Sequence, residues 1–314
     1  MKLNEIISGV LRGDKTSISR AISIVEGEPG SKNSKMLIEK IYKNIGNAHI
    51  IGITGPPGIG KSTMIGRLTE MIANSGKRVS VVAIDASSPF SGGAFLGNRI
   101  RMQESLARNG IFMRSIASRG MEGGLTASIW ETVKILDAGG SDYIIVETVG
   151  AGQSDIEVVN LAHTVVVVFG PGLGDQIQAL KAGIMEIANI FVVNKIDLPG
   201  AYIAMKDLQD TLAMSQQKGW KIPVLGVNSL NGTGFEELIS KIGAHMDYIQ
   251  TNDSAKEEII RKELKVIAME ELRRSFERKM NTFLSDRKNN ESLKKRNVNI
   301  YQIVDAILRD DDKS

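Results

Sequence analysis

The chain has 314 residues, 42% of them hydrophobic and 24% charged, which is an ordinary composition for a globular protein. It contains no cysteine, and this excludes disulfides, thiolate metal sites and cysteine nucleophiles. The net charge of +3 gives no reason to expect nucleic acid as a partner. No apolar run is as long as a membrane span, and no export signal is evident, so we expect a cytoplasmic protein.

The first segment, residues 1–47, is predicted to be a helical extension. Its first apolar residues recur at helical spacing among polar ones, at Leu3, Ile6, Ile7, Val10 and Leu11. The sequence Gly-Glu-Pro-Gly at 27–30 interrupts the helical pattern.

Residues 48–252 are predicted to form a doubly wound α/β domain with a mostly parallel sheet. Apolar runs alternate there with helical stretches, a pattern that implies right-handed crossovers between parallel strands. A run of four valines at 165–168 is apolar without alternation, which indicates a strand buried on both faces. The candidate strands are 49–54, 79–84, 111–116, 142–147, 164–169, 190–194 and 222–227.

Residues 253–314 differ in composition from the preceding domain and are predicted to form a helical arm. A highly charged stretch carries one apolar stripe from Ile260 to Leu284, and a second amphipathic helix is indicated from Ile300 to Leu308. We favour self-association through these apolar faces, which gives a homodimer. The alternative is that the arm packs back on the α/β domain of its own chain.

Residues 55–63 match the phosphate-loop pattern G-x-x-x-x-G-K-[ST], between an apolar run and a helical stretch. Glycines allow backbone N–H groups to point at phosphates, Lys61 would reach the β- and γ-phosphates, and the Ser62 hydroxyl would bind Mg²⁺. A Gly/Pro-rich surface turn is the alternative. The predicted nucleotide contacts in this loop are Gly55, Pro56, Pro57, Gly58, Ile59, Gly60, Lys61, Ser62 and Thr63.

A second motif, Asn194-Lys195-Ile196-Asp197, ends another apolar run and predicts guanine as the base. The Asp197 carboxylate can accept hydrogen bonds from both N1–H and the 2-amino group of guanine, and adenine has neither donor in that place. An unpaired buried acceptor costs several kcal/mol, which is enough for base selection. We expect Asn194 and Lys195 to brace the phosphate loop and to cover the base, so the ligand is GTP or GDP.

Three further segments follow strands and each brings a carboxylate, Asp85, Glu147 or Asp175. Mg²⁺ prefers hard oxygen ligands, often through water, so we assign Ser62, Asp85 and Glu147 to the metal. Any one of these carboxylates alone could instead cap a loop. The Gly150 N–H is expected to meet the γ-phosphate, and the candidate catalytic residues are Lys61, Glu147, Gln153 and Asp175.

These motifs closely resemble the MeaB/ArgK/MMAA family of phosphate-loop GTPases, which are chaperones of B12-dependent acyl-CoA mutases, above all methylmalonyl-CoA mutase. The resemblance covers nearly the whole chain. It implies a homodimeric GTPase that uses GTP and Mg²⁺, binds the mutase, gates adenosylcobalamin loading and keeps damaged cofactor out. The motifs that carry it are the phosphate loop, the segments from Asp85, 96–102 and 118–120, Glu-Thr-Val-Gly-x-Gly-Gln-Ser from Glu147, Pro-Gly-x-Gly-Asp at 171–175, and Asn-Lys-x-Asp.

The chain departs from that family in several places. Asn98 stands where Asp is usual, which could weaken Mg²⁺ binding or slow hydrolysis. The base-covering Ser-Ala-Leu is replaced by Asn228-Ser229-Leu230, to which we assign base contacts. Because Ala151 follows Gly150, where Ras-like proteins have the water-orienting Gln, we expect slow intrinsic hydrolysis that the mutase accelerates.

Three other functions compete with this one. The first is a nucleotide-dependent kinase associated with arginine or ornithine transport proteins, and Asp197 argues against its use of ATP. The second is a nickel or cobalt insertion GTPase, which needs soft ligands, whereas this chain has no cysteine and three histidines far apart in sequence. Each histidine is expected to be a strand-end or surface residue. The third is a stand-alone signalling GTPase, for which the arm would be superfluous.

Overall fold

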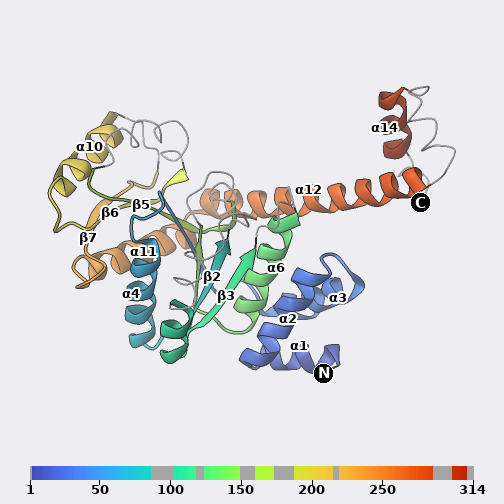
Figure 1. The fold of residues 1–314 in the computed structure, drawn as a ribbon, viewed down its shortest axis with the longest axis horizontal. Coiled ribbons are helices and arrows are strands. Elements are labelled where there is room, and N and C mark those ends of the chain that lie inside the picture. Colours follow the sequence, from blue (N-terminus) through green and yellow to red (C-terminus); the bar gives the residue numbers. More distant parts are fainter. Residues whose placement is uncertain are drawn as a thin grey trace. The chain divides into compact units, whose positions relative to one another are not determined.

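The computed structural model describes residues 2–85, 102–117, 124–148, 160–172, 187–214, 219–285 and 299–309 (Figure 1). The chain divides into two compact units, Met1–Lys262 and Glu263–Ser314.

A seven-stranded parallel sheet forms the centre of the first unit, in the order β3-β2-β4-β1-β5-β6-β7. This confirms the predicted α/β class, because each candidate run overlaps one of the strands, although β2 and β3 each end one residue later than predicted. β7 begins two residues later than predicted, after Pro223, which has no N–H to donate to a ladder. The strands are β1 His49–Thr54, β2 Val79–Asp85, β3 Phe112–Ala117, β4 Tyr143–Glu147, β5 Thr164–Phe169, β6 Ile190–Asn194 and β7 Val224–Val227.

Helices cover both faces of the sheet, which explains why its central strands are continuously apolar. α4 (Lys61–Asn74) and α11 (Phe235–Thr251) pack on one face against alternate strand residues such as Val166 and Val168. α10 (Ala201–Met214) packs on the other face, where the rings of Phe169 and Phe191 lie 5.7 Å apart. Neighbouring residues of β5 therefore point into the cores on opposite faces of the sheet. Because these side chains are buried, a functional site has to form from the loops at the strand ends.

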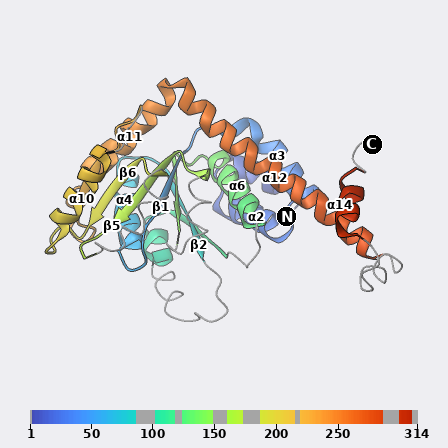
Figure 2. The same ribbon diagram turned by 90° about the horizontal axis from the view of Figure 1, so that it is seen from above.

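The N-terminal extension forms α1 (Leu3–Leu11), α2 (Lys15–Gly27) and α3 (Lys32–Ile41), which pack beside α6 (Gly124–Ala138) (Figures 1 and 2). An ion pair joins Glu26 of α2 to Arg114 of β3. The Asp137 carboxylate at the end of α6 accepts the backbone N–H groups of residues 46–48, just before β1. Both contacts fasten the extension to the rest of the first unit, and the second lies just before the strand that leads into the phosphate loop.

The C-terminal region contains α12 (Asp253–Ser285) and α14 (Ile300–Arg309), and Figure 2 shows α12 as one continuous helix. Its apolar residues Ile260, Leu264 and Leu272 are 55%, 63% and 62% exposed. Ion pairs along the helix, such as Glu270 with Arg273, stabilise it. None of the helices among the described residues combines the length and apolarity needed to cross a membrane.

Candidate functional site

The phosphate loop links the end of β1 to the start of α4, and two of its glycines are required by the space around them. Gly55 has a φ of 143°, and a Cβ there would lie 2.2 Å from the carbonyl oxygen of Val168 in β5. Gly60 has a φ of 95°, and its Cβ would lie 2.6 Å from Nδ2 of Asn194. No side chain can replace these hydrogens without moving the loop, so the close packing explains the glycine pattern of the motif.

Lys61 is the first residue of α4 and is only 7% exposed. Its Nζ donates to the carbonyl oxygens of Gly55, at 2.6 Å, and Pro56, at 3.0 Å. Because the helix N-cap is Gly60, no side chain caps the first turn of α4. A partly buried ammonium group and an uncapped helix N-terminus therefore face the same loop, an arrangement suited to a phosphate chain.

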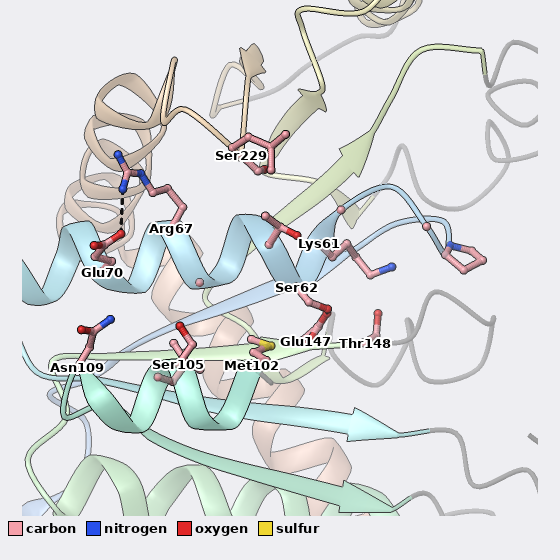
Figure 3. Close-up of a pocket in the computed structure, with 17 residues that line it drawn as sticks. Lys61, Ser62, Arg67, Glu70, Met102, Ser105, Asn109, Glu147, Thr148 and Ser229 are labelled. Atoms are coloured by element: carbon pink, nitrogen blue, oxygen red, sulfur yellow. Dashed lines mark hydrogen bonds and ion pairs between the residues drawn. The ribbon is translucent and has the colours of Figure 1, made fainter. Parts of the chain in front are cut away.

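Ser62 and Glu147 lie together beside this loop (Figure 3). The Ser62 Oγ donates to Oε1 of Glu147 at 2.7 Å, and Glu147 is 3% exposed. Glu147 ends β4, where it pairs with Ile53 of β1 and Ala83 of β2. Ala83 is the β2 residue opposite Glu147, so Asp85, the last residue of β2, lies two positions further along that strand.

A hydroxyl beside a carboxylate is a suitable partial ligand set for Mg²⁺, which takes oxygen ligands and usually keeps several waters. Within the described ranges, no group of three or more His, Cys, Asp or Glu side chains could hold a metal. The residues thus fit an ion that takes its remaining ligands from nucleotide phosphates and water, and they do not fit a dedicated protein cage.

Asn194, the last residue of β6, and Lys195, which follows it, both donate to the phosphate loop. The Nδ2 of Asn194 donates to the Ile59 carbonyl oxygen at 2.9 Å, and Nζ of Lys195 donates to the Gly58 carbonyl oxygen at 3.2 Å. Lys195 has a φ of 60°, the only positive φ at a non-glycine residue in the described part of the chain. This backbone conformation directs the Lys195 side chain toward the loop, at a modest cost in strain.

The loop after β7 closes the other side of the site. Oδ1 of Asn194 accepts hydrogen bonds from the backbone N–H of Ser229, at 3.2 Å, and from its hydroxyl, at 2.8 Å. Oδ1 of Asp197 accepts from Nδ2 of Asn228 at 2.7 Å. The Leu230 side chain is 86% exposed. The phosphate loop, the Asn-Lys-x-Asp segment and residues 228–230 therefore form one hydrogen-bonded unit.

A cavity of about 860 Å³ opens beside the phosphate loop, Ser229 and Leu230 and extends along α4, and no residue of 194–197 is among those that line it (Figure 3). Its walls include predicted residues and also α4 residues that the sequence analysis did not single out, among them Arg67 and Glu70, which form an ion pair of 2.9 Å. Arg67 and Glu70 follow the predicted Thr63 at intervals of four and three residues, and this helical spacing was the signal that could have identified them. Residues 102–109 contribute Met102, Ser105, Leu106 and Asn109.

Several predicted residues lie outside the described part of the chain. These are Asn98, Gly150, Gln153 and Asp175, whose assigned roles remain predictions. Of Asp85, only its position at the end of β2 is described.

The three histidines gather at the opposite end of the sheet, although they are far apart in sequence. Thr164 Oγ1 lies 2.7 Å from both His49 Nε2 and His245 Nδ1, and His163 Nδ1 accepts from the Ile50 N–H. Burial, and then repulsion from the other histidines, lowers the pKa of His49 to about 3. Burial and His163 lower the pKa of His245 to about 4. This cluster belongs to the core and is remote from the phosphate loop.

Comparison with known proteins gives a consistent result. A family model described as methylmalonyl-CoA mutase-associated GTPase MeaB matches residues 18–281. A Pyrococcus horikoshii protein with GTPase in its name is 45% identical over 259 residues, or 81% of each chain. The GTPase ArgK of Escherichia coli is 32% identical over 243 residues, which span 75% of this chain and 73% of ArgK. The mitochondrial methylmalonic aciduria type A homolog of Mus musculus is 30% identical over 253 residues, 75% of this chain and 61% of that protein.

Among solved structures, a LAO/AO transport system kinase aligns with a TM-score of 0.72, over 98% of this chain and 96% of that one. The identity is 22%, so this likeness establishes the fold alone.

Proposed function

The chain belongs to the methylmalonyl-CoA mutase-associated GTPase family, and on that premise we propose that it controls cofactor loading in a B12-dependent acyl-CoA mutase. Its relatives are named GTPases, and the chain is a GTPase. The proposed partner is methylmalonyl-CoA mutase, for which the chain would gate the entry of adenosylcobalamin and exclude damaged cofactor. The family match carries the mutase part of the proposal, and the hydrogen-bonded unit formed by Lys61, Asn194 and Asp197 with their loops carries its nucleotide site.

The nucleotide is proposed to bind with its phosphates at the start of α4 and its base at Asp197. Lys61 would exchange the carbonyl oxygens of Gly55 and Pro56 for β- and γ-phosphate oxygens, and the uncapped first turn of α4 would donate its N–H groups to the same phosphates. Both groups stabilise negative charge where it increases during phosphoryl transfer. Asp197 would accept hydrogen bonds from the N1–H and the 2-amino group of guanine, because an ionised carboxylate has only acceptor oxygens.

Ser62 and Glu147 are the residues that would hold Mg²⁺, with Asp85 as a further candidate. When bound, this ion neutralises charge on the β- and γ-phosphate oxygens. The 2.7 Å bond between them is compatible with this role, because the Ser62 hydroxyl keeps its lone pairs when it donates its proton to Glu147. Burial of Glu147 keeps its carboxylate in place beside the hydroxyl.

The proposal assigns a role to each part of the chain. Residues 48–252 would bind and hydrolyse GTP, residues 1–47 would be the N-terminal extension, and residues 253–314 would be the arm of a homodimer. The exposed apolar residues of α12 support the last assignment, because exposed apolar side chains on a charged helix favour burial against a second helix.

The experiment measures GTP hydrolysis by the full chain with and without methylmalonyl-CoA mutase, and complex formation with GDP and with a non-hydrolysable GTP analogue. We expect the mutase to raise the rate, and by linkage the nucleotide to change the affinity for the mutase. A GTPase with no complex in either nucleotide state and an unchanged rate would remove the mutase from the proposal. Transfer of ³²P from γ-labelled nucleotide to a basic-amino-acid transport protein would instead support the kinase.

A further inference from the structure

One buried hydroxyl joins two histidines at the end of the sheet away from the phosphate loop. Oγ1 of Thr164, in β5, lies 2.7 Å from Nε2 of His49, in β1, and 2.7 Å from Nδ1 of His245, in α11. Thr164 is fully buried, and each of the two histidines is 3% exposed. The cluster therefore ties α11 to two central strands through polar groups that have little access to water.

The single proton of the Thr164 hydroxyl limits the charge that the cluster can hold. The hydroxyl can donate to only one of the two rings and has to accept from the other, so one ring nitrogen carries a proton and the other does not. If both imidazoles were charged, both nitrogens would be donors, and the hydroxyl proton would have no ring acceptor left. Two positive charges would also face one buried oxygen. The geometry therefore suits two neutral rings and disfavours two charged ones.

The rings that face His49 carry no negative charge to offset a proton. His49 meets the edge of Tyr143 in β4, with ring centroids 6.2 Å apart, and lies 5.6 Å from the ring of His163. The carboxylate of Asp142, which precedes Tyr143, accepts the backbone N–H of Arg78 at 2.7 Å. Burial, and then repulsion from the other histidines, lowers the pKa of His49 to about 3.

The surroundings of His245 are also aromatic. Its ring centroid lies 4.7 Å from that of Trp220 and 6.0 Å from that of Tyr248. On α11 itself, Lys241 stands one turn earlier and adds positive charge, and Asp247 is exposed. Burial, and then repulsion from a neighbouring histidine, lowers the pKa of His245 to about 4. Both histidines are therefore neutral at pH 7 in the folded protein.

We propose that Thr164, His49 and His245 form an acid-sensitive lock on α11, which opens with the uptake of two protons. When α11 separates from the sheet, both imidazoles reach water, where each binds a proton near its ordinary pKa of about 6.5. Acid therefore favours the open form of α11 over the closed form. α11 packs on α4, the helix that begins at the phosphate loop, and α12 starts two residues after α11 ends. The lock thus makes the packing of this connecting helix depend on pH.

The size of the effect follows from the two pKa values. Two histidines that titrate near 6.5 when open, and near 3 and 4 when closed, raise the opening equilibrium about sixtyfold between pH 5.5 and pH 4.5. One of these histidines alone would raise it only about eightfold over the same interval. The number of protons taken up can therefore be read from the size of the response.

The experiment measures hydrogen exchange of the full chain at pH 5.5 and pH 4.5 by mass spectrometry, corrected for the intrinsic pH dependence of exchange. We expect the protection of residues 242–251 in α11 to fall about sixtyfold, because exchange there follows the opening equilibrium. α10 packs on the other face of the sheet and contains no histidine, so its protection should stay within about threefold. An equal loss in α10 would indicate global unfolding, and an unchanged α11 would show that the cluster does not open; either result overturns the proposal.

Two variants remove one titrating ring each and keep a contact with Thr164. His49→Gln places an amide near Nε2, and His245→Asn places one near Nδ1. Each variant should reduce the fall in α11 protection to about eightfold. Thr164→Ser is the matched control, because it keeps the hydroxyl and should retain the sixtyfold fall. A sixtyfold fall in both histidine variants would refute the lock, and the comparison of α11 with α10 in the wild-type chain decides the question even if a variant fails to fold.

Discussion

The substitution Gly60→Ala tests whether Asn194 holds the phosphate loop and the loop of residues 228–230 together. A Cβ at residue 60 would lie 2.6 Å from Nδ2 of Asn194, the atom that donates to the Ile59 carbonyl oxygen. Asn194 also accepts two hydrogen bonds from Ser229. Displacing its side chain therefore disturbs three hydrogen bonds and separates the two loops.

The expected loss of folding stability in Gly60→Ala has two contributions. An alanine forced to keep the positive φ of 95° costs ~1–2 kcal/mol. Breaking the buried Asn194 network costs a further ~1–3 kcal/mol, because its polar groups lose their partners. Gly58→Ala is the matched control, since residue 58 also has a positive φ, of 75°, but a Cβ there has no atom within 4 Å. It should carry the strain term alone.

The measurement is thermal unfolding of the nucleotide-free protein, followed by GDP titration of each variant. At about 2–4 °C per kcal/mol, Gly60→Ala should unfold several degrees below Gly58→Ala. It should also lose GDP affinity, because both ends of the nucleotide site move. Equal unfolding temperatures for the two variants would show that Asn194 yields without cost, and the mechanical link between the loops would then be refuted.

Lys61→Ala should abolish tight GDP binding, because it removes the ammonium group at the phosphate loop. The same substitution at the exposed Lys77 should leave binding intact. If calorimetry finds that Lys61→Ala binds GDP within about twofold of wild type, or ~0.4 kcal/mol, the phosphate site is disproved. The pKa of His49 is about 3 in the folded protein and 6.5 in the unfolded chain, so the unfolded chain binds more protons between these pH values. The free energy of unfolding should therefore fall as the pH drops from 6.5 toward 3, by up to ~1.4 kcal/mol per pH unit. Chemical denaturation against pH checks this, and His49→Gln should reduce the slope and leave the part that His245 contributes. Deletion of residues 253–314 should leave a monomer that still binds GDP, and light scattering that finds the intact chain monomeric at micromolar concentration would contradict the homodimer.

The sequence alone determined the fold class and the locations of the motifs. Strands such as β5 could be predicted because burial on both faces requires an uninterrupted apolar run, and such a run is a local property of the chain. The phosphate loop could be predicted for a similar reason, since one short segment supplies its glycines and Lys61 together.

Only the tertiary structure decided how these parts meet. Ser62 contacts Glu147 across 85 residues, Ser229 contacts Asn194 across 35, and Asn228 contacts Asp197 across 31. No periodicity or spacing in the chain encodes such pairs, because they depend on which strands become neighbours in the sheet. The same reason hid the histidines: His49 and His245 are separated by most of the first unit, and the pairing of β1 with β5 together with the packing of α11 brings both of them to Thr164.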